Sequence, residues 1–558
     1  MSNRRSCPSR TTRTHRPRLE ALEDRKVLTA GALDATFGTG GKVMMGFLPT
    51  DPNSLVEVRA VAVYPSTAGE NANKILAVGY AKLPATTTSG QDFALFRYNT
   101  NGTPDTTFGT NGMVTTDFNG GSDIAYGVAI DASGKIVAAG SAAVSSASTS
   151  ITTIAVARYN PNGSLDTDPA TGFGPLDSTD RLRTGKVTTA AGTTSEARGV
   201  VIQPADGKIV VGGTGAITNL AAFAVARYNN DGTLDTGFGT GGLNVNLIAK
   251  ASHARAIALQ ADGRIVLAGD SIVGSITEFA AARYTSSGVL DNSFGSGGAV
   301  STQIGASNKS TGIPVNDEAA GLAIDPQGRI VLAGYTTDTS TRAHPLHSAM
   351  VRYTTSGILD TSFGGTGKVV TPLGPSPTDT GRAVVIQPDG KIILAGNAYA
   401  YPGSNSYNYD FALARFTSAG ALDGTFGTNG KVLTSFTSSS DYAIAVALQP
   451  DGGIVAGGSA NGNLALARYL GDSPLTATAL ATGRTAVAGL TEAQVSPAFG
   501  EVVAGWAASG SPIWPDLTSD GPPGTRSRWT GTRQVGDGLW TRPGHAGRSE
   551  PLSSSRGQ

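Results

Sequence analysis

The sequence is poor in cysteine, in charge and in long apolar runs. Cys7 is the only cysteine among 558 residues, which excludes an intrachain disulfide and a metal site built from several thiolates. No run approaches the roughly 18 apolar residues of a membrane-spanning helix. Charged residues make up 15%, and 42 basic residues balance 42 acidic ones. We therefore expect no membrane span and no nucleic-acid partner, with stability supplied by a buried core.

Glycine is abundant instead, with 75 residues, which is typical of short strands joined by many turns. One unit recurs along the chain, and each of its three marks occurs seven times. An Asp-x-x-Phe-Gly turn begins at Asp34, Asp105, Asp166, Asp235, Asp291, Asp360 and Asp423, and the third copy is interrupted so that Phe173 comes late. A Gly-Lys-Ile-like turn is marked by Asn73, Gly134, Gly207, Gly263, Gly328, Gly390 and Gly452. An Ala-Arg-Tyr-like end contains Arg97, Arg158, Arg227, Arg283, Arg352, Arg415 and Arg468.

Each unit is expected to form four short strands, because apolar residues alternate and glycine interrupts every run. In the fourth unit we place them at 242–248, 254–260, 264–269 and 279–284. A four-stranded sheet with two apolar faces cannot bury both faces alone, whereas seven sheets packed radially can. The sequence therefore predicts an all-β fold over 31–470, a seven-bladed β-propeller of four-stranded antiparallel blades.

The ends of the repeat suggest how the ring closes. The chain enters through an FGTGGKV block at 37–43 and leaves after Tyr469 without an eighth such block. We expect the strand that starts at Val43 to pair with the last blade as its missing outer strand. The alternative is a ring that closes by packing alone.

The repeated D-x-x-F-G, D-G-K-I and A-R-Y blocks resemble the delta-60 repeat family, a bacterial group of β-propellers. The resemblance covers nearly all of 31–470. It implies the propeller fold, but the family has no agreed activity or catalytic residues to transfer.

The two ends of the chain differ from the repeat. Residues 1–30 carry eight Lys or Arg against three Asp or Glu and are expected to form a disordered basic arm. Within it, RPRLEALEDRKVL (16–28) resembles an N-terminal segment of large planctomycete proteins, which implies export and an extracellular or cell-surface location. Residues 471–558 are expected to be a linker, a short helix near 490–508 and a disordered tail. A shifted reading frame over 509–558 is one hypothesis for that tail.

Strand direction sorts the loops onto two faces. The stereotyped turns fall on one face, and the loops of variable length fall on the other, which is the usual binding face of a repeat protein. The third-to-fourth-strand loops on that face are expected at 80–92, 141–153, 214–221, 270–278, 335–347, 397–410 and 459–463. The loop 397–410 is rich in tyrosine, and its rings could stack on a ligand or pack on the blade. The candidate ligand contacts are Tyr399, Tyr401, Tyr407 and Tyr409.

Motifs that look chemical are explained by repetition. Seven Asp and seven Arg at equivalent positions predict turn caps and ion pairs between neighbouring units. The FGTGGKV blocks lack the ending of a phosphate-binding loop, and the segment 229–235 lacks the downstream Glu of an EF-hand. His344 and His347 lie in a loop rather than on a helix. We expect no catalytic, cofactor or metal site, and Asp317 and Glu318 remain only as upper-loop acids that could act.

Three functions remain open. The first is a monomeric, non-enzymatic binding or scaffold module with an unknown protein or polysaccharide ligand. The second is a hydrolase or lyase with its site at the mouth of the central channel. The third is a structural spacer of a larger envelope protein. A cluster of Asp, Glu, His or Tyr side chains at the upper mouth would favour the enzyme, and an apolar mouth would favour binding.

Overall fold

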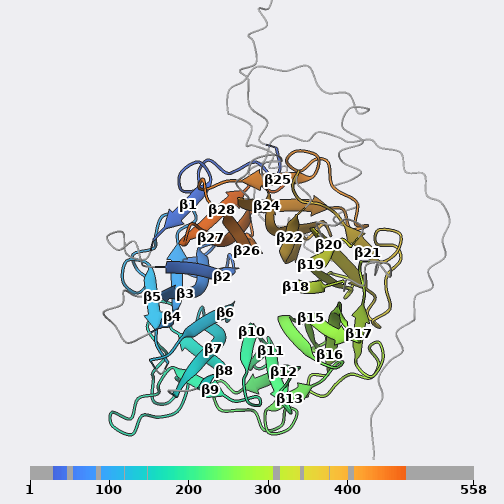
Figure 1. Ribbon diagram of the computed structural model, residues 1–558. Helices are drawn as coiled ribbons and strands as arrows, with labels where there is room; N and C mark the ends of the chain where they lie inside the picture. Colours follow the sequence, from blue (N-terminus) through green and yellow to red (C-terminus); the bar gives the residue numbers. More distant parts are fainter. Residues whose placement is uncertain are drawn as a thin grey trace, which may run out of the picture. The chain divides into compact units, whose positions relative to one another are not determined.

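The protein forms seven four-stranded antiparallel sheets around a central opening, as shown in Figure 1. This computed structural model describes residues 29–46, 55–82, 90–118, 120–146, 149–305, 315–339, 345–375, 378–399 and 408–472. The predicted fold class is confirmed over these residues. They contain a 3-10 turn, η1 (Gly69–Asn71), and no helix long or apolar enough to cross a membrane.

The strands group into blades in chain order. The first two blades contain β2 (Leu55–Val63), β3 (Ile75–Lys82), β4 (Gln91–Tyr98), β5 (Met113–Thr116), β6 (Asp123–Ile130), β7 (Ile136–Ser146), β8 (Thr149–Tyr159) and β9 (Lys186–Thr189). The third and fourth contain β10 (Glu196–Ile202), β11 (Ile209–Ile217), β12 (Leu220–Tyr228), β13 (Leu243–Asn246), β14 (Ser252–Leu259), β15 (Ile265–Val273), β16 (Ile276–Tyr284) and β17 (Ala299–Thr302). The fifth and sixth contain β18 (Asp317–Ile324), β19 (Ile330–Thr337), β20 (Leu346–Tyr353), β21 (Lys368–Val370), β22 (Asp379–Ile386), β23 (Ile392–Tyr399), β24 (Tyr409–Phe416) and β25 (Lys431–Thr434). The seventh contains β26 (Asp441–Leu448), β27 (Ile454–Ala460), β28 (Asn463–Tyr469) and β1 (Lys42–Met45).

The ring closes by strand pairing, as the sequence predicts. β1 pairs with β28 in antiparallel register, from Lys42 opposite Ala467 to Met45 opposite Leu464. The N-terminal strand thus completes the blade formed by the end of the repeat, and every blade has four strands. Closure gives the seventh blade its fourth strand, so each blade keeps only one short edge at the channel and one at the outside.

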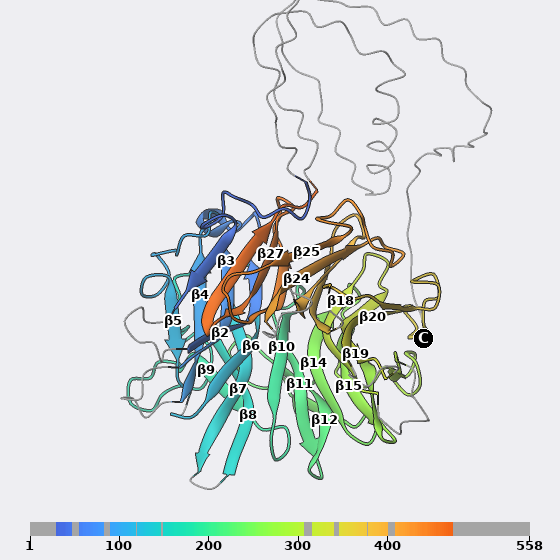
Figure 2. The same cartoon turned by 45° about the horizontal axis from the view of Figure 1, so that its top comes forward.

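Each blade is offset by one strand from the sequence unit. The strand that follows an Asp-x-x-Phe-Gly turn is the outer strand of the blade just completed, and the next strand begins a new blade near the axis. β2, β6, β10, β14, β18, β22 and β26 therefore surround the central opening (Figure 1). Figure 2 shows the strands running between two faces of the ring. We call the face on which these inner strands begin the upper face, and the opposite one the lower face.

The first hairpin of every blade ends in a turn that needs a left-handed residue. The Gly-Lys-Ile mark supplies it, because glycine adopts positive φ at no steric cost and asparagine at little. The values range from 61° at Asn73 to 87° at Gly452. All seven of these turns lie on the lower face, at the ends of the inner strands.

A buried ion pair holds each lower-face turn to its blade. In six blades the arginine Nε lies 2.6 to 2.8 Å from a carboxylate oxygen of the Asp-x-x-Phe-Gly aspartate that follows it in the chain. In the seventh blade Arg468 pairs with Asp34, so the same contact also joins the two ends of the ring. The predicted pairing between neighbouring units is confirmed. In six blades a Lys or Arg from the first hairpin reaches the same aspartate.

The arginine also connects its blade to the next one. Arg97 donates to the carbonyl oxygen of Pro161, and Arg352 to that of Ser418, each in the following unit. The guanidinium lies over the phenylalanine of the turn, with its carbon 4.6 Å from the ring centre of Phe108 in the first blade. The late Phe173 reaches the equivalent place, so the interrupting residues loop out without displacing it.

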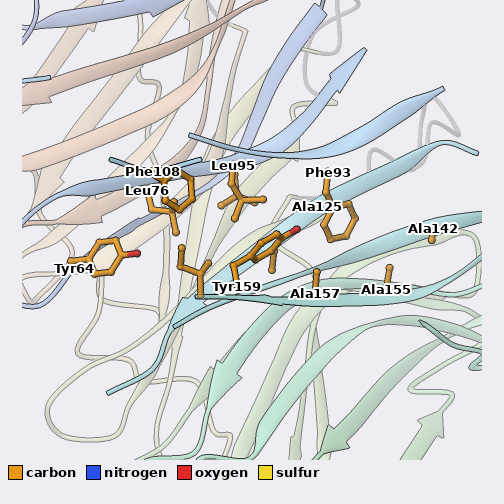
Figure 3. Packing of buried hydrophobic residues seen from close by; sticks show 13 residues of the cluster. Tyr64, Leu76, Phe93, Leu95, Phe108, Ala125, Ala142, Ala155, Ala157 and Tyr159 are labelled. Atoms are coloured by element: carbon orange, nitrogen blue, oxygen red, sulfur yellow. The ribbon is translucent and has the colours of Figure 1, made fainter. Parts of the chain in front are cut away.

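The core lies between the blades rather than inside one sheet. Seven clusters of buried side chains each join two neighbouring blades. Figure 3 shows the cluster between the first and second blades, where Phe93 and Leu95 of β4 face Ala155 and Ala157 of β8. In the same cluster the buried hydroxyl of Tyr159 donates to Thr116 of the preceding blade at 2.8 Å. Small alanines allow the sheets to approach closely.

Three of the expected upper-face loops are shorter than predicted. β7 and β8, β11 and β12, and β15 and β16 continue as paired strands through most of 141–153, 214–221 and 270–278. Thr218 and Asn219 both adopt positive φ and close one of these hairpins in two residues. These segments contain serine, threonine and glycine, but their β-branched residues extend the ladder.

The N-terminal arm 1–28, the helix near 490–508 and the possible frame change at 509–558 lie outside the described residues. Those three expectations stay predictions.

The buried ion pair yields a stability prediction. Asp166→Asn should lower the free energy of unfolding by about 3–5 kcal/mol, because Arg158 keeps a buried charge without its counter-ion. Urea unfolding followed by circular dichroism measures the change. The matched control is Asp206→Asn in an exposed turn, where a change within about 0.5 kcal/mol is expected. Equal losses in both variants would contradict the structural role assigned to the pair.

Candidate functional site

All seven inner strands carry a β-bulge at the same place. The register to the second strand skips one residue in each blade, so that residue has no cross-strand partner. Bulges commonly re-aim a side chain next to a functional site. We call the seven skipped residues the bulge ring, and they are Arg59, Tyr126, Arg198, Arg255, Ala320, Arg382 and Ile444.

The bulge ring lies in the upper half of the central opening. All seven residues are partly exposed, although they belong to the innermost strands. A second circle of side chains, the rim, lies two residues earlier in each strand, nearer the upper face. The rim residues are Glu57, Ile124, Glu196, His253, Glu318, Thr380 and Tyr442. Together the two circles place four arginines, three glutamates, a histidine and two tyrosines at the mouth of the channel.

Small residues follow the bulge ring directly. The next position is Ala or Gly in every blade, namely Ala60, Gly127, Gly199, Ala256, Gly321, Ala383 and Ala445. A Cβ on Gly127 would lie 2.7 Å from the Cα of Gly199 on the neighbouring inner strand, so the strands approach too closely there for a side chain. This close packing lies just below the charged mouth.

A charged network joins the fourth and fifth blades. His253 Nδ1 lies 2.9 Å from Asp270 Oδ2, and Arg255 Nε donates to Asp270 Oδ1 at 2.8 Å. Arg255 also forms a 3.0 Å ion pair with Glu318. Burial raises the pKa of Tyr335, and a hydrogen bond with Glu318 raises it further. Asp270 is almost fully buried, whereas the side chain of His253 is 43% exposed.

A second network lies on the first blade. The hydroxyl of Tyr80 donates to Glu57 at 2.5 Å, and Arg59 pairs with the same carboxylate at 3.2 Å. Burial, together with the neighbouring Glu57, raises the pKa of Tyr80 to about 12, so its phenol stays protonated. Arg59 Nε is buried without a hydrogen-bond partner among the described residues.

Tyr126 connects this network to the third blade. The guanidinium carbon of Arg198 lies 4.0 Å from the ring centre of Tyr126, and that of Arg59 lies 5.9 Å from it. Arg198 Nε also donates to the carboxylate of Glu196 in its own strand, at 2.6 Å. Two arginines from different blades therefore share one aromatic ring.

Arg382 differs from the other three arginines of the bulge ring. It takes part in no ion pair or hydrogen bond between described residues, and its guanidinium carbon lies 5.7 Å from the ring centre of Tyr335. Burial raises the pKa of Tyr409, and the charge of Arg382 opposes that rise, which places Arg382 near this phenol as well. A positive charge here is available to a ligand.

Several tyrosines lie on the blades next to Arg382. Tyr399 and Tyr409 are cross-strand partners at the upper end of β23 and β24, and their rings stack with centres 4.1 Å apart. The ring centre of Tyr442, a rim residue of the seventh blade, lies 5.6 Å from that of Tyr409. Two of the four candidate tyrosines thus adjoin the channel mouth, whereas Tyr401 and Tyr407 lie outside the described residues.

The other acidic residues and histidines that stand out in the sequence form hydrogen bonds or ion pairs with neighbouring parts of the blades, or lie outside the described residues. Asp317 is buried and accepts a hydrogen bond from the backbone of Ile304, whereas its neighbour Glu318 belongs to the rim. His347 lies 3.7 Å from Asp338, and a hydrogen bond with Asp379, together with the charge of Asp338, raises the pKa of His347. His344 lies outside the described residues. In the segment 229–235, Asp235 is neutralised by Arg227 and Lys208, and the segment forms a turn.

The bulge ring was not found from the sequence, although a signal exists there. Aligning the inner strands places Arg four times before a Gly or Ala at one position, at Arg59, Arg198, Arg255 and Arg382. In the sequence, the variable loops stand out and the inner strands look like scaffold. The alternation of a single strand does not show that a bulge interrupts the pairing at the position of these arginines.

The lower mouth of the opening has a different character. A hollow of about 620 Å³ there is lined by the ends of inner strands and their turns, including Pro65, Pro326, Pro388 and Pro450. Glutamines 387 and 449 and a single acid, Asp325, supply its polar groups. The charged and aromatic side chains of the bulge ring and the rim lie instead at the upper mouth.

Comparisons with known families point to the repeat. Six segments match the family model described as "Domain of unknown function (DUF5122) beta-propeller", consistent with a propeller repeat family: residues 73–108, 132–168, 205–238, 260–294, 326–363 and 387–426. Five of the six segments run from the first-hairpin turn to the phenylalanine of the next Asp-x-x-Phe-Gly turn, and the second ends at Asp168, before the late Phe173. All seven bulge-ring positions fall outside the matched segments.

Solved structures show a likeness in fold alone. The polysaccharide lyase Uly1 is 12% identical, covers 74% of this chain and 90% of its own, and has a TM-score of 0.41. Sqt1 from Chaetomium thermophilum is 12% identical over 75% of this chain and 83% of its own, with a TM-score of 0.35. An exo-1,5-alpha-L-arabinanase from a bovine ruminal metagenomic library is 13% identical over 48% and 91%, with a TM-score of 0.26. No curated protein matches the sequence.

The networks predict unequal costs for two arginines of the bulge ring. Arg255→Ala should lower the free energy of unfolding by about 2–4 kcal/mol, because it leaves the buried Asp270 with His253 as its only ionisable partner. Arg382→Ala should cost less than about 1 kcal/mol, since no ion pair is lost. Parallel urea titrations measure both. A larger loss for Arg382→Ala would show that Arg382 is structural.

Proposed function

We propose that this protein binds an acidic polysaccharide or oligosaccharide at the upper mouth of its central channel. The observation that supports this most directly is the bulge ring, which brings four arginines and a tyrosine from different blades to one partly exposed mouth. Carbohydrates offer many hydroxyl groups, and ion-paired Arg and Glu side chains present planar sets of donors and acceptors to them.

The tyrosines favour a sugar over a small inorganic anion. Tyr399, Tyr409 and Tyr442 form one aromatic group on the sixth and seventh blades, and Tyr442 is 37% exposed. An aromatic ring with a polar tip offers an apolar face for a sugar ring and a hydroxyl for its substituents. This group adjoins the predicted contact loop, which fits the variable face acting in recognition.

Arg382 favours an acidic sugar. The other arginines of the bulge ring are paired with carboxylates, whereas Arg382 has no carboxylate partner among the described residues and lies next to the ring of Tyr335. Its planar guanidinium matches a carboxylate in bidentate fashion. A uronate whose ring rests on the tyrosines would place its carboxylate within reach of this charge.

Binding to a uronic-acid oligosaccharide tests the proposal. Oligogalacturonate should bind the protein in isothermal titration calorimetry, and Arg382→Ala should weaken it at least about tenfold, or 1.4 kcal/mol. Affinity should also fall with added salt, because the interaction involves charge.

The matched control is Arg181→Ala, which removes an exposed arginine from the lower-face connection between β8 and β9 and should leave the affinity unchanged. The methyl ester of the same oligosaccharide should bind weakly. Equal affinity for the ester, or no effect of Arg382→Ala, would contradict recognition of a carboxylate at Arg382.

A second candidate function is catalysis on the same ligand, as a hydrolase or lyase. The observation that favours it is the His253–Asp270 pair, together with the other titratable side chains at the mouth. A buried carboxylate that holds one nitrogen of an exposed imidazole is the usual arrangement of an oriented general base. Nε2 of His253 has no partner among the described residues.

Product analysis separates the two functions. If the protein is an enzyme, acidic polysaccharide should be shortened, with new reducing ends from hydrolysis or an unsaturated sugar that absorbs ultraviolet light from elimination. His253→Ala should then abolish product formation while oligosaccharide binding persists, because Arg382 and the tyrosines are untouched. Binding without any product would leave the non-enzymatic function.

A further inference from the structure

A polar site recurs between each pair of neighbouring blades on the upper face. Three residues form it. One lies near the start of the third strand of a blade, the second follows the outer strand of that blade, and the third lies at the start of the inner strand of the next blade. Between the first and second blades these are Asp92, Asp117 and Asp123.

The seven copies of this site differ in charge. The other six sets are Thr153, Ala190 and Ser195; Ala222, Leu247 and Ser252; Glu278, Gln303 and Asp317; His347, Pro372 and Asp379; Asp410, Ser435 and Asp441; and Asn463, Gly46 and Val56. None of these six has three carboxylates. The shared task of the site is to cap the upper turn, as Asp123, Asp317 and Asp441 do by accepting a backbone N–H at 2.6 Å. Capping needs one acid, not three.

The three carboxylates are close together and two of them are buried. One oxygen from each lies within 4.8 Å of the others. Asp92 is 5% exposed and Asp123 is 0% exposed, whereas Asp117 is exposed. The Oδ1 atoms of both Asp92 and Asp123 are buried without a hydrogen-bond partner. Buried carboxylate oxygens are normally paired or bound to a cation, because an uncompensated charge is costly.

Neighbouring groups do not neutralise the cluster. Lys186 Nζ donates to the backbone oxygen of Asp117 rather than to a carboxylate, and Lys42 and Lys368 make the same backbone contact at two other copies of the site. The N–H of Gly120 binds Asp117 Oδ1 at 2.6 Å. None of the three aspartates forms an ion pair with another described residue.

We propose that Asp92, Asp117 and Asp123 bind a calcium ion between the first and second blades. Ligands of one Ca²⁺ lie 2.3–2.6 Å from it, so two of them can be up to about 5 Å apart, as these oxygens are. Oxygen-only ligands favour a hard cation over zinc or copper. The ion would join the outer strand of one blade to the inner strand of the next and order the turn that precedes β6.

Calcium titration of the full chain tests the proposal. Isothermal titration calorimetry should show one bound Ca²⁺ per chain with a Kd of about 10⁻⁵ to 10⁻³ M. Asp117→Ser copies the residue found at Ser435 in the equivalent site, so it should fold, yet it should weaken binding at least about tenfold. Saturating Ca²⁺ should raise the melting temperature of the wild-type protein and not that of Asp117→Ser.

The converse variant is a matched control. Ser435→Asp gives the site of Asp410 and Asp441 a third carboxylate and should raise the stoichiometry to two ions. No saturable calcium binding by the wild-type protein would overturn the proposal, as would equal binding by Asp117→Ser or tighter binding of Mg²⁺ than of Ca²⁺. An unchanged stoichiometry in Ser435→Asp would contradict the role of the third acid.

Discussion

The buried pair between an arginine and the aspartate of the following turn is the contact on which the ring depends. It fixes the outer turn to the end of the third strand in every blade, and through the arginine's second contact it fixes one blade to the next. At the closure, Arg468 and Asp34 make the same pair across the two ends of the repeat. A phenylalanine under the guanidinium excludes water from the pair, so the charges hold one geometry rather than many.

Most of the fold could be predicted from the sequence, because its determinants are local and repeated. The count of Asp, Gly and Arg marks gave seven blades, and the phase of Val43 against Tyr469 predicted strand closure. Hairpin lengths were less predictable, since Thr218 and Asn219 close a turn that the Ser and Gly content did not reveal. Tyr399 and Tyr409, two of the four tyrosines that the sequence suggests as ligand contacts, lie beside the proposed mouth, and their part in binding stays a prediction. Arg382 was missed because a bulge depends on the pairing of two strands, which no single strand's alternation records.

Repetition separates the scaffold from the site. The Asp, Arg and Phe of the repeat make the same contacts in six blades, and the family model matches six segments that contain these Arg and Asp residues. The bulge ring lies between those segments and differs from blade to blade, as does the acidic set at Asp92, Asp117 and Asp123. Tightly packed small residues below the ring, such as Gly127 and Gly199, place its charges at the upper mouth. The two ligand sites that we propose therefore lie where equivalent positions of the repeat carry unequal residues.

The most direct test of this account is to map where an acidic oligosaccharide protects the protein from hydrogen–deuterium exchange. Binding at the upper mouth should slow exchange at the upper ends of the inner strands β2, β10, β14 and β22 and at the hairpin of β23 and β24. The lower-face turns that contain the buried Asp–Arg pairs should be unchanged. Protection confined to the lower face, or no protection by any acidic or neutral saccharide, would contradict the claim that the upper mouth is the functional site.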